Sequence, residues 1–159
     1  MAAGIALLVI GGATGWGVTQ YSTGTTAQAP ENQFVRQALN AHVVYAHDAN
    51  RPVELRSTEQ KRLINWLSDR LDHKLMTPDL AGKGFHLIGG RLVNDQSMRA
   101  ALFMYEDKFE NRVSLYVRPG MVGGNTKFRF IAEHGTVAFY WTNGLLTYAL
   151  TGEIPCTRS

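Results

Sequence analysis

An α+β fold is predicted for this chain of 159 residues: an apolar N-terminal segment, two helices and then an antiparallel β-meander. Between residues 31 and 72, apolar residues recur with a helical period in two segments. From Phe85 onward they recur at every second position, as in strands that bury one face. Helices followed by a run of antiparallel strands are typical of an α+β domain.

Composition favours one folded domain with an appendage. Hydrophobic residues make up 45% of the chain, which is enough for a core, and charged residues make up 18%. The formal net charge is +3 and the basic residues are spread along the chain, so no nucleic-acid partner is expected. The single cysteine, Cys156, excludes an internal disulfide and a cysteine-rich zinc site.

Residues 1–21 are predicted to form a transmembrane helix. Residues 2–18 are apolar or small, and the first charged side chain is Glu31. A helix of this length spans the hydrocarbon core of about 30 Å. Gly11 and Gly15 have the spacing that lets two membrane helices approach closely, which would allow a homodimer, although abundant glycine explains it as well. The side chains expected to contact lipid are Ile5, Leu7, Leu8, Val9, Ile10 and Trp16.

A cleaved signal peptide is the alternative for this segment. Ala27-Gln28-Ala29 matches the pattern of a cleavage site, but no Lys or Arg precedes the apolar run, and Pro30 would follow the cut.

The composition divides the rest of the chain, from residue 22 onward, into three parts. These are a flexible linker at 22–30, the folded domain at 31–153 and an irregular tail at 154–159, consistent with truncation.

Two helices are expected to open the domain, at residues 30–46 and 57–72, with an extended segment at 51–55 between them. Ser57 and Gln60 have the spacing of a capping box, so the second helix should begin there. Its apolar face contains Leu63, Ile64, Trp66, Leu67 and Leu71.

Strands are expected from residue 85 to the end of the domain. In the first of them, Gly89-Gly90 predicts a bulge rather than the close approach of a ligand. Asn143-Gly144 is the strongest hairpin signal, because a type I′ turn needs positive φ at both central residues. Short connections predict that successive strands are antiparallel neighbours. The later strands are expected at 99–105, 112–118, 127–132, 136–141 and 145–150.

No pattern typical of catalysis or metal binding stands out. His42 and His47 are five residues apart and the other histidines are scattered, so no set of metal ligands is predicted. No serine stands in a nucleophile elbow. Aromatic and basic residues interleave in the strands, but alternation should put many rings into the core. We therefore expect no enzyme, and no catalytic, cofactor or metal site. The groups that could be combined as acid, base and nucleophile are Ser68-Asp69, Glu106-Asp107 and His134.

Several short motifs between about residues 41 and 152 carry a resemblance to a known family. They are Trp66-Leu67-Ser68, Arg70-Leu71, Pro78-Asp79-Leu80, Gly84-Phe85, Leu87-Ile88-Gly89-Gly90-Arg91-Leu92, Ala101-Leu102-Phe103-Met104-Tyr105 and the segment from Trp141 to Leu150. These motifs resemble the periplasmic half of bacterial transmembrane anti-sigma factors. Because they are fold motifs, the candidates for structural or interaction roles are Trp66, Leu67, Gly89, Gly90 and Arg91.

The resemblance implies a single-pass signalling protein of the bacterial inner membrane, with its C-terminal domain in the periplasm. It implies regulation of an extracytoplasmic function sigma factor through a cytoplasmic segment that is absent from this sequence, so this chain alone should not inhibit one. The other partners implied are the lipid bilayer and a periplasmic or envelope protein. The alternative is a signal-anchored periplasmic domain, ligand-binding or enzymatic, unrelated to sigma regulation.

Overall fold

The computed structural model describes residues 30–48, 52–95 and 98–153, which form two α-helices and a six-stranded antiparallel sheet. Residues from 33 onward belong to one compact unit. The predicted α+β class, with two helices and an antiparallel sheet, is confirmed. The predicted transmembrane helix lies outside the described residues. Among the residues that are described, no helix is long and apolar enough to cross a membrane.

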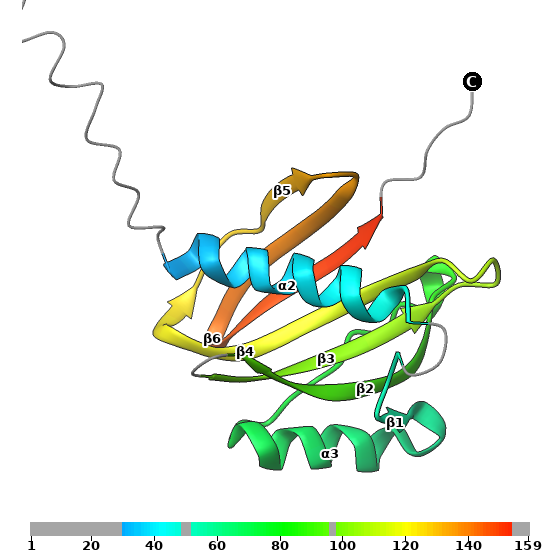
Figure 1. The fold of residues 1–159 in the computed structure, drawn as a ribbon. Helices are drawn as coiled ribbons and strands as arrows, with labels where there is room; N and C mark the ends of the chain where they lie inside the picture. The colour runs from blue at the N-terminus through cyan, green and yellow to red at the C-terminus, as the bar shows by residue number, and fades with distance from the viewer. Residues whose placement is uncertain (1–29, 49–51, 96–97, 154–159) are drawn as a thin grey trace, which may run out of the picture. The chain divides into compact units, whose positions relative to one another are not determined.

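The two helices lie on opposite faces of the sheet (Figure 1). They are α2 (Pro30–Ala46) and α3 (Gln60–Leu71). Short 3-10 turns occur at η1 (Ser57–Glu59) and η2 (Ala81–Lys83). The strands are β1 (Leu55–Arg56), β2 (His86–Asp95), β3 (Met98–Glu106), β4 (Arg112–Asn125), β5 (Arg129–Glu133) and β6 (Thr136–Glu153).

The strand order is β1-β2-β3-β4-β6-β5, and every neighbouring pair is antiparallel. The predicted meander therefore holds from β1 to β4 and again from β5 to β6, and it fails between β4 and β5. β6 pairs with β4 on one side and with β5 on the other, so β5 lies at the edge of the sheet. The sequence missed this because the β4–β5 connection is short, yet these two strands are not neighbours.

Strand β3 is the centre of the core, because it is covered on both faces. A strand buried on both faces reads as a continuous apolar run rather than an alternation. Its even-numbered residues pack in the cluster beneath α2, and its odd-numbered residues pack in the cluster against α3. The first group is Ala100, Leu102 and Met104, and the second is Ala101, Phe103 and Tyr105.

Helix α3 begins later than predicted, and the expected capping box does not form. Residues 57–59 adopt a 3-10 turn, and neither this turn nor α3 has a side-chain N-cap bond. The Gln60 amide instead donates to the Thr77 hydroxyl, at 3.3 Å. The helix ends at Leu71, and the C-cap residue Asp72 has left-handed geometry with φ 55°. Tertiary packing of the apolar face, rather than the cap, therefore determines where α3 lies.

The Gly89-Gly90 bulge is confirmed. The β2–β3 register shifts between Leu87 and Gly89, and β1 pairs with β2 there, with Leu55 opposite Gly90. A side chain on Gly89 would meet the Leu55 carbonyl oxygen and Val53. The glycines of the bulge thus leave room for β1 to lie against β2.

The predicted chain reversal at Asn143-Gly144 is confirmed, although the element β6 runs through it. The rings of Trp141 and Tyr148 stack with centroids 5.2 Å apart, and the hydroxyls of Thr142 and Thr147 lie 3.3 Å apart. Residues seven and five positions apart in one extended strand would be separated by about 23 and 17 Å. β6 therefore consists of two arms, 136–142 and 145–153, that lie side by side (Figure 1). Gly144 has φ 64° but Asn143 does not have positive φ, so the turn is not the expected type I′.

Candidate functional site

The sheet face against which α3 packs is only partly covered by that helix. Helix α3 packs on β1, β2 and β3. Strand β5 lies beyond β4 and both arms of β6, or about 19 Å from β3 at the usual spacing of antiparallel strands. A helix with its side chains is only about 10–12 Å across. The outer part of this face, on β5 and the first arm of β6, therefore lies beyond the reach of α3, whereas Leu146 and Tyr148 of the second arm are buried in its cluster.

Four aromatic side chains occupy this uncovered part, and we call them the aromatic strip: Phe128, Phe130, Phe139 and Trp141. Phe130 is directly opposite Phe139 across β5 and β6, with ring centroids 5.1 Å apart. Phe128 lies beside Trp141, with centroids 4.9 Å apart. Both pairs are tilted, an arrangement that aromatic quadrupoles favour.

The aromatic strip combines exposure with a rigid base. Phe128, Phe130 and Phe139 are 72%, 59% and 45% exposed. Trp141 is half-buried and stacks on the buried Tyr148, with centroids 5.2 Å apart and an interplanar angle of 7°. Burial also raises the pKa of Tyr148, so its hydroxyl stays neutral. Contiguous exposed rings on a packed base are typical of protein-binding surfaces.

The turn at His134-Gly135 positions this strip. Both residues have positive φ, 50° and 80°, as a two-residue hairpin requires. The turn closes with Glu133 opposite Thr136, and this register places the two aromatic residues of each arm on one face. The sequence contained this signal, because aromatics two apart on each arm lie at equal distances from the turn. Our expectation that rings would enter the core holds for Phe103, Tyr105, Tyr116 and Tyr148, but not for the phenylalanines of the aromatic strip.

The candidate residues of the resemblance gather around β1, not around the aromatic strip. Leu67 is fully buried on α3, and its Cδ1 would lie 3.2 Å from a side chain on Gly90. Trp66 is half-buried and carries the Arg70 guanidinium 5.4 Å from its ring centroid. These residues hold α3, β1 and β2 together, so their role in this structure is packing.

Arg91 lies on the opposite face, beneath the end of α2. Its guanidinium is 3.7 Å from the centroid of the Tyr45 ring. It also lies 3.8 Å from the Glu54 carboxylate. Arg91 thereby ties α2 to the segment that leads into β1.

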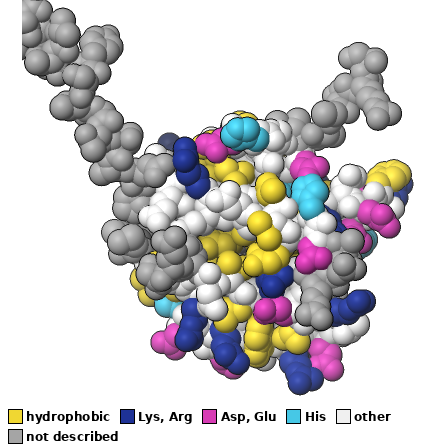
Figure 2. Space-filling model, viewed as in Figure 1, with side chains coloured by type: hydrophobic (Ala, Val, Ile, Leu, Met, Phe, Trp, Pro, Cys, Tyr) yellow, Lys and Arg dark blue, Asp and Glu magenta, His cyan; other side chains and the backbone are white. Residues whose placement is uncertain are grey.

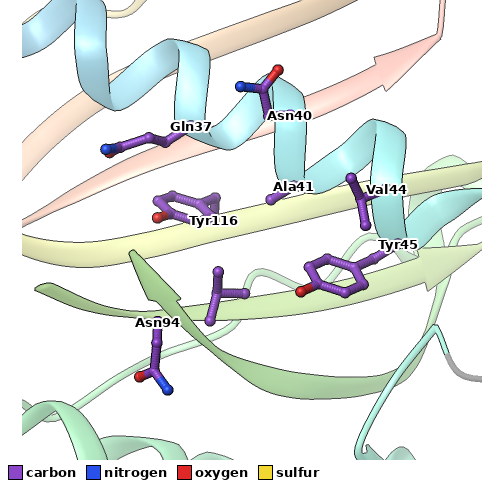
Figure 3. Close-up of a pocket in the computed structure, with 8 residues that line it drawn as sticks. Gln37, Asn40, Ala41, Val44, Tyr45, Asn94 and Tyr116 are labelled. Atoms are coloured by element: carbon purple, nitrogen blue, oxygen red, sulfur yellow. The ribbon is translucent and has the colours of Figure 1, made fainter. Parts of the chain in front are cut away.

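A hollow of about 220 Å³ opens beneath α2. Figure 2 shows apolar side chains gathered below this helix, with charged side chains mostly lower on the same face. In Figure 3 the rings of Tyr45 and Tyr116 lie between α2 and the strands, while the side chain of Asn94 points away from the helix. Helix residues Gln37 and Asn40 supply polar groups at the upper wall. The hollow is small and its floor is mostly apolar.

A buried polar pair between α2 and β4, His42 and Ser114, was not predicted from the sequence. Nδ1 of His42 lies 2.8 Å from the Ser114 hydroxyl, and both side chains are fully buried. Thr151, the register partner of Ser114, is buried as well. Within the described residues, Nε2 of His42 and the Thr151 hydroxyl make no hydrogen bond. A serine and histidine that solvent does not reach cannot meet a substrate in this conformation.

The side chains that could be combined as acid, base and nucleophile have separate structural roles. The Ser68 hydroxyl donates to the Ile64 carbonyl oxygen and accepts from the Leu75 amide. Glu106 accepts from Arg112 at 2.8 Å. Asp107 accepts from the Asn111 side chain and from two backbone amides of its turn, which lower the pKa of this carboxyl. None of the hydrogen bonds of Ser68, Glu106 and Asp107 joins one of these three groups to another.

The remaining histidines are also dispersed. His47 contacts Glu153 at 2.8 Å, and His73 lies 2.8 Å from the Leu71 carbonyl oxygen. Within residues 30–48, 52–95 and 98–153, no group of three or more His, Cys, Asp or Glu could hold a metal ion.

Comparisons of the chain with protein-family models, with curated proteins and with solved structures each find no match.

Proposed function

We propose that this chain is a membrane-anchored regulator of an extracytoplasmic function sigma factor, with the α+β domain as its periplasmic sensor. The resemblance of residues 41–152 to anti-sigma factors supports this assignment. The length and lack of charge of residues 1–21 support a membrane anchor. The sensor would meet an envelope protein rather than transform a substrate.

One observation carries the proposal that the domain senses a protein: the aromatic strip. Phe128, Phe130 and Phe139 expose large rings side by side on a sheet face that α3 does not reach. Rings held by Trp141 and Tyr148 lose little conformational freedom when a partner covers them. Aromatic residues also dominate binding energy at many protein interfaces.

A transcription reporter tests this proposal in the bacterium that encodes the chain. The reporter follows the sigma factor encoded beside the chain, before and after envelope stress. Deleting the chain's gene should change the reporter. Phe128→Ser and Phe139→Ser should each abolish the stress response at an unchanged protein level. The matched control is Phe109→Ser, because Phe109 is also 72% exposed but lies in the β3–β4 turn.

Two results would contradict the proposal in different ways. A reporter that ignores deletion of the gene would remove the link to sigma regulation. A normal stress response in both Phe128→Ser and Phe139→Ser would be compatible with sigma regulation but would show that the aromatic strip is not the sensing surface.

The membrane anchor has its own test. The full chain should sediment with membranes and remain there after carbonate extraction, since residues 1–21 provide a span. Recovery of a soluble protein whose first residue is Pro30 would show that the Ala27-Gln28-Ala29 site is cut and that no anchor remains.

The hollow beneath α2 favours a second candidate function, the binding of a small, mostly apolar ligand. Asn40→Trp would fill it from the exposed side of α2 without entering the core. If this variant loses the envelope response while Phe128→Ser keeps it, ligand binding replaces protein sensing as the function.

A further inference from the structure

Strand β5 offers an open edge, and its sequence is complementary to itself. Its outer side has no neighbour among the described residues, since β5 is the last strand of the sheet. The other edge strand, β1, has only two residues. β5 has five: Arg129, Phe130, Ile131, Ala132 and Glu133. Open edges of this length readily pair with a further strand.

The backbone of β5 is prepared for such pairing. Glu133 and Thr136 close the two-residue turn, so the alternation of an antiparallel ladder directs the amide groups of Phe130 and Ala132 to the open edge. If two β5 strands pair around a two-fold axis at Ile131, Phe130 of one copy is opposite Ala132 of the other. The outward amide groups of both strands then meet in hydrogen-bonded pairs.

The same register matches the charges. Arg129 lies opposite Glu133 of the second copy, and Glu133 lies opposite its Arg129, so the pairing forms two opposite-charge pairs. A slip by two residues in either direction separates these charges. Cross-strand pairs of opposite charge stabilise a sheet, and like charges in the same place destabilise it. The charge pattern therefore selects one partner and one register.

We propose that β5 is a dimerisation edge, where a second copy of this chain adds its own β5 in antiparallel register centred on Ile131. The two sheets become one, and the aromatic strips of the two copies join through Phe130 on the same face. The half-buried Ile131 side chains meet on the other face, between the charge pairs. This proposal is independent of sigma regulation, because it rests on the edge of β5 alone.

Cysteine crosslinking of the purified full chain tests the register, with Cys156 replaced by serine in every variant. In the proposed pairing the two Ile131 Cα atoms are about 4.5 Å apart, within disulfide range. Ile131→Cys should therefore form a covalent dimer under copper phenanthroline. Ala132→Cys is the matched control, because its partner is Phe130 of the second copy. Phe109→Cys controls for random collision between exposed sites.

Charge reversal tests the pairing rule. Arg129→Glu and Glu133→Arg should each weaken association about tenfold, because each places like charges opposite one another twice. The double variant Arg129→Glu/Glu133→Arg should restore association, which loss of folding would not do. Sedimentation of the full chain in a density-matched detergent measures the association constant, and circular dichroism confirms that each variant is folded.

Several results would overturn the proposal. One is that Ile131→Cys forms no covalent dimer. Another is that Ala132→Cys or Phe109→Cys crosslinks as much as Ile131→Cys. A third is that the double variant Arg129→Glu/Glu133→Arg does not recover association. A crosslink of Ile131→Cys to a different protein in cells would show that the edge is occupied by a foreign strand instead of a second copy.

Discussion

His42 and Ser114 meet 2.8 Å apart in the apolar layer between α2 and β4, far from any solvent contact. A neutral imidazole can share this hydrogen bond, whereas a charged imidazolium would be buried at high cost. Burial is the largest cause that lowers the pKa of His42, from 6.5 to about 4. Glu153 opposes this shift, and His47 adds to it.

The first prediction is that stability falls in mild acid. The unfolded chain takes up a proton at His42 below about pH 6.5, but the folded chain does so only near pH 4. The free energy of unfolding should therefore be fully retained above pH 6.5 and decrease between pH 6.5 and 4. The loss is about 2 kcal/mol at pH 5. Urea unfolding of the full chain at pH 7 and pH 5 measures it.

The variant His42→Leu should reduce stability at pH 7 but flatten the dependence on pH. His134→Gln, at an exposed position in the β5–β6 turn, is the control and should keep the wild-type slope. An unchanged slope in His42→Leu would assign the acid sensitivity to other groups.

A second prediction concerns Gly89. Gly89→Ala should cost at least about 2 kcal/mol, because the new methyl group would collide with the Leu55 carbonyl oxygen at a backbone φ of 155°. The added group must push β1 away from β2. Gly82→Ala is the matched control: nothing lies within 4 Å of its added methyl, so stability should hardly change. Comparable urea midpoints for the two variants would mean that β1 is not fixed where it pairs with the bulge.

The third prediction ranks two neighbours on α3. Leu67→Ala should cost about 2–5 kcal/mol, because Leu67 is fully buried. Trp66→Ala should cost less, about 1–3 kcal/mol, because Trp66 is half-buried and its ring faces the Arg70 guanidinium. Thermal unfolding of both variants gives the order, and a larger loss for Trp66→Ala would reverse the assignment of the inner face.

The fourth prediction concerns Arg112, which holds the end of α2. Its guanidinium donates to the Ala46 and Asp48 carbonyl oxygens, at 2.8 and 3.2 Å, and its Nε donates to Glu106. Arg112→Lys should cost about 1–3 kcal/mol, because lysine cannot reproduce the planar fork. The control is Arg62→Lys, in an exposed pair with Glu59, which should be close to neutral. Equal losses of stability in Arg112→Lys and Arg62→Lys would refute a specific role for the planar guanidinium of Arg112.

The fold was predictable where a local pattern decided it. The face of α3 that contains Leu63, Leu67 and Leu71 is buried as expected. The bulge at Gly89-Gly90 is present as well. The position of β6 between β4 and β5 was not predictable, because it depends on pairing between distant residues.

Local turn chemistry was a reliable guide. Asn143-Gly144 and His134-Gly135 both have turn composition, and the chain reverses at both. The sequence did not show the pairing that follows, in which β4 pairs with the second arm of β6 and β5 with the first. The aromatic strip was overlooked for a related reason: alternation shows which rings share a face, but coverage of that face depends on how far α3 reaches. The His42–Ser114 contact joins residues 72 positions apart and left no local signal.

The reversal at Asn143-Gly144 separates two kinds of evolutionary freedom within β6. In the arm before Asn143, Ala138 is buried, but Phe139 on the other face is exposed, so a new side chain there meets solvent or a binding partner. In the arm after Gly144, Leu146 and Tyr148 are buried and tolerate little change. Recognition can therefore diversify at Phe139 while the scaffold stays the same.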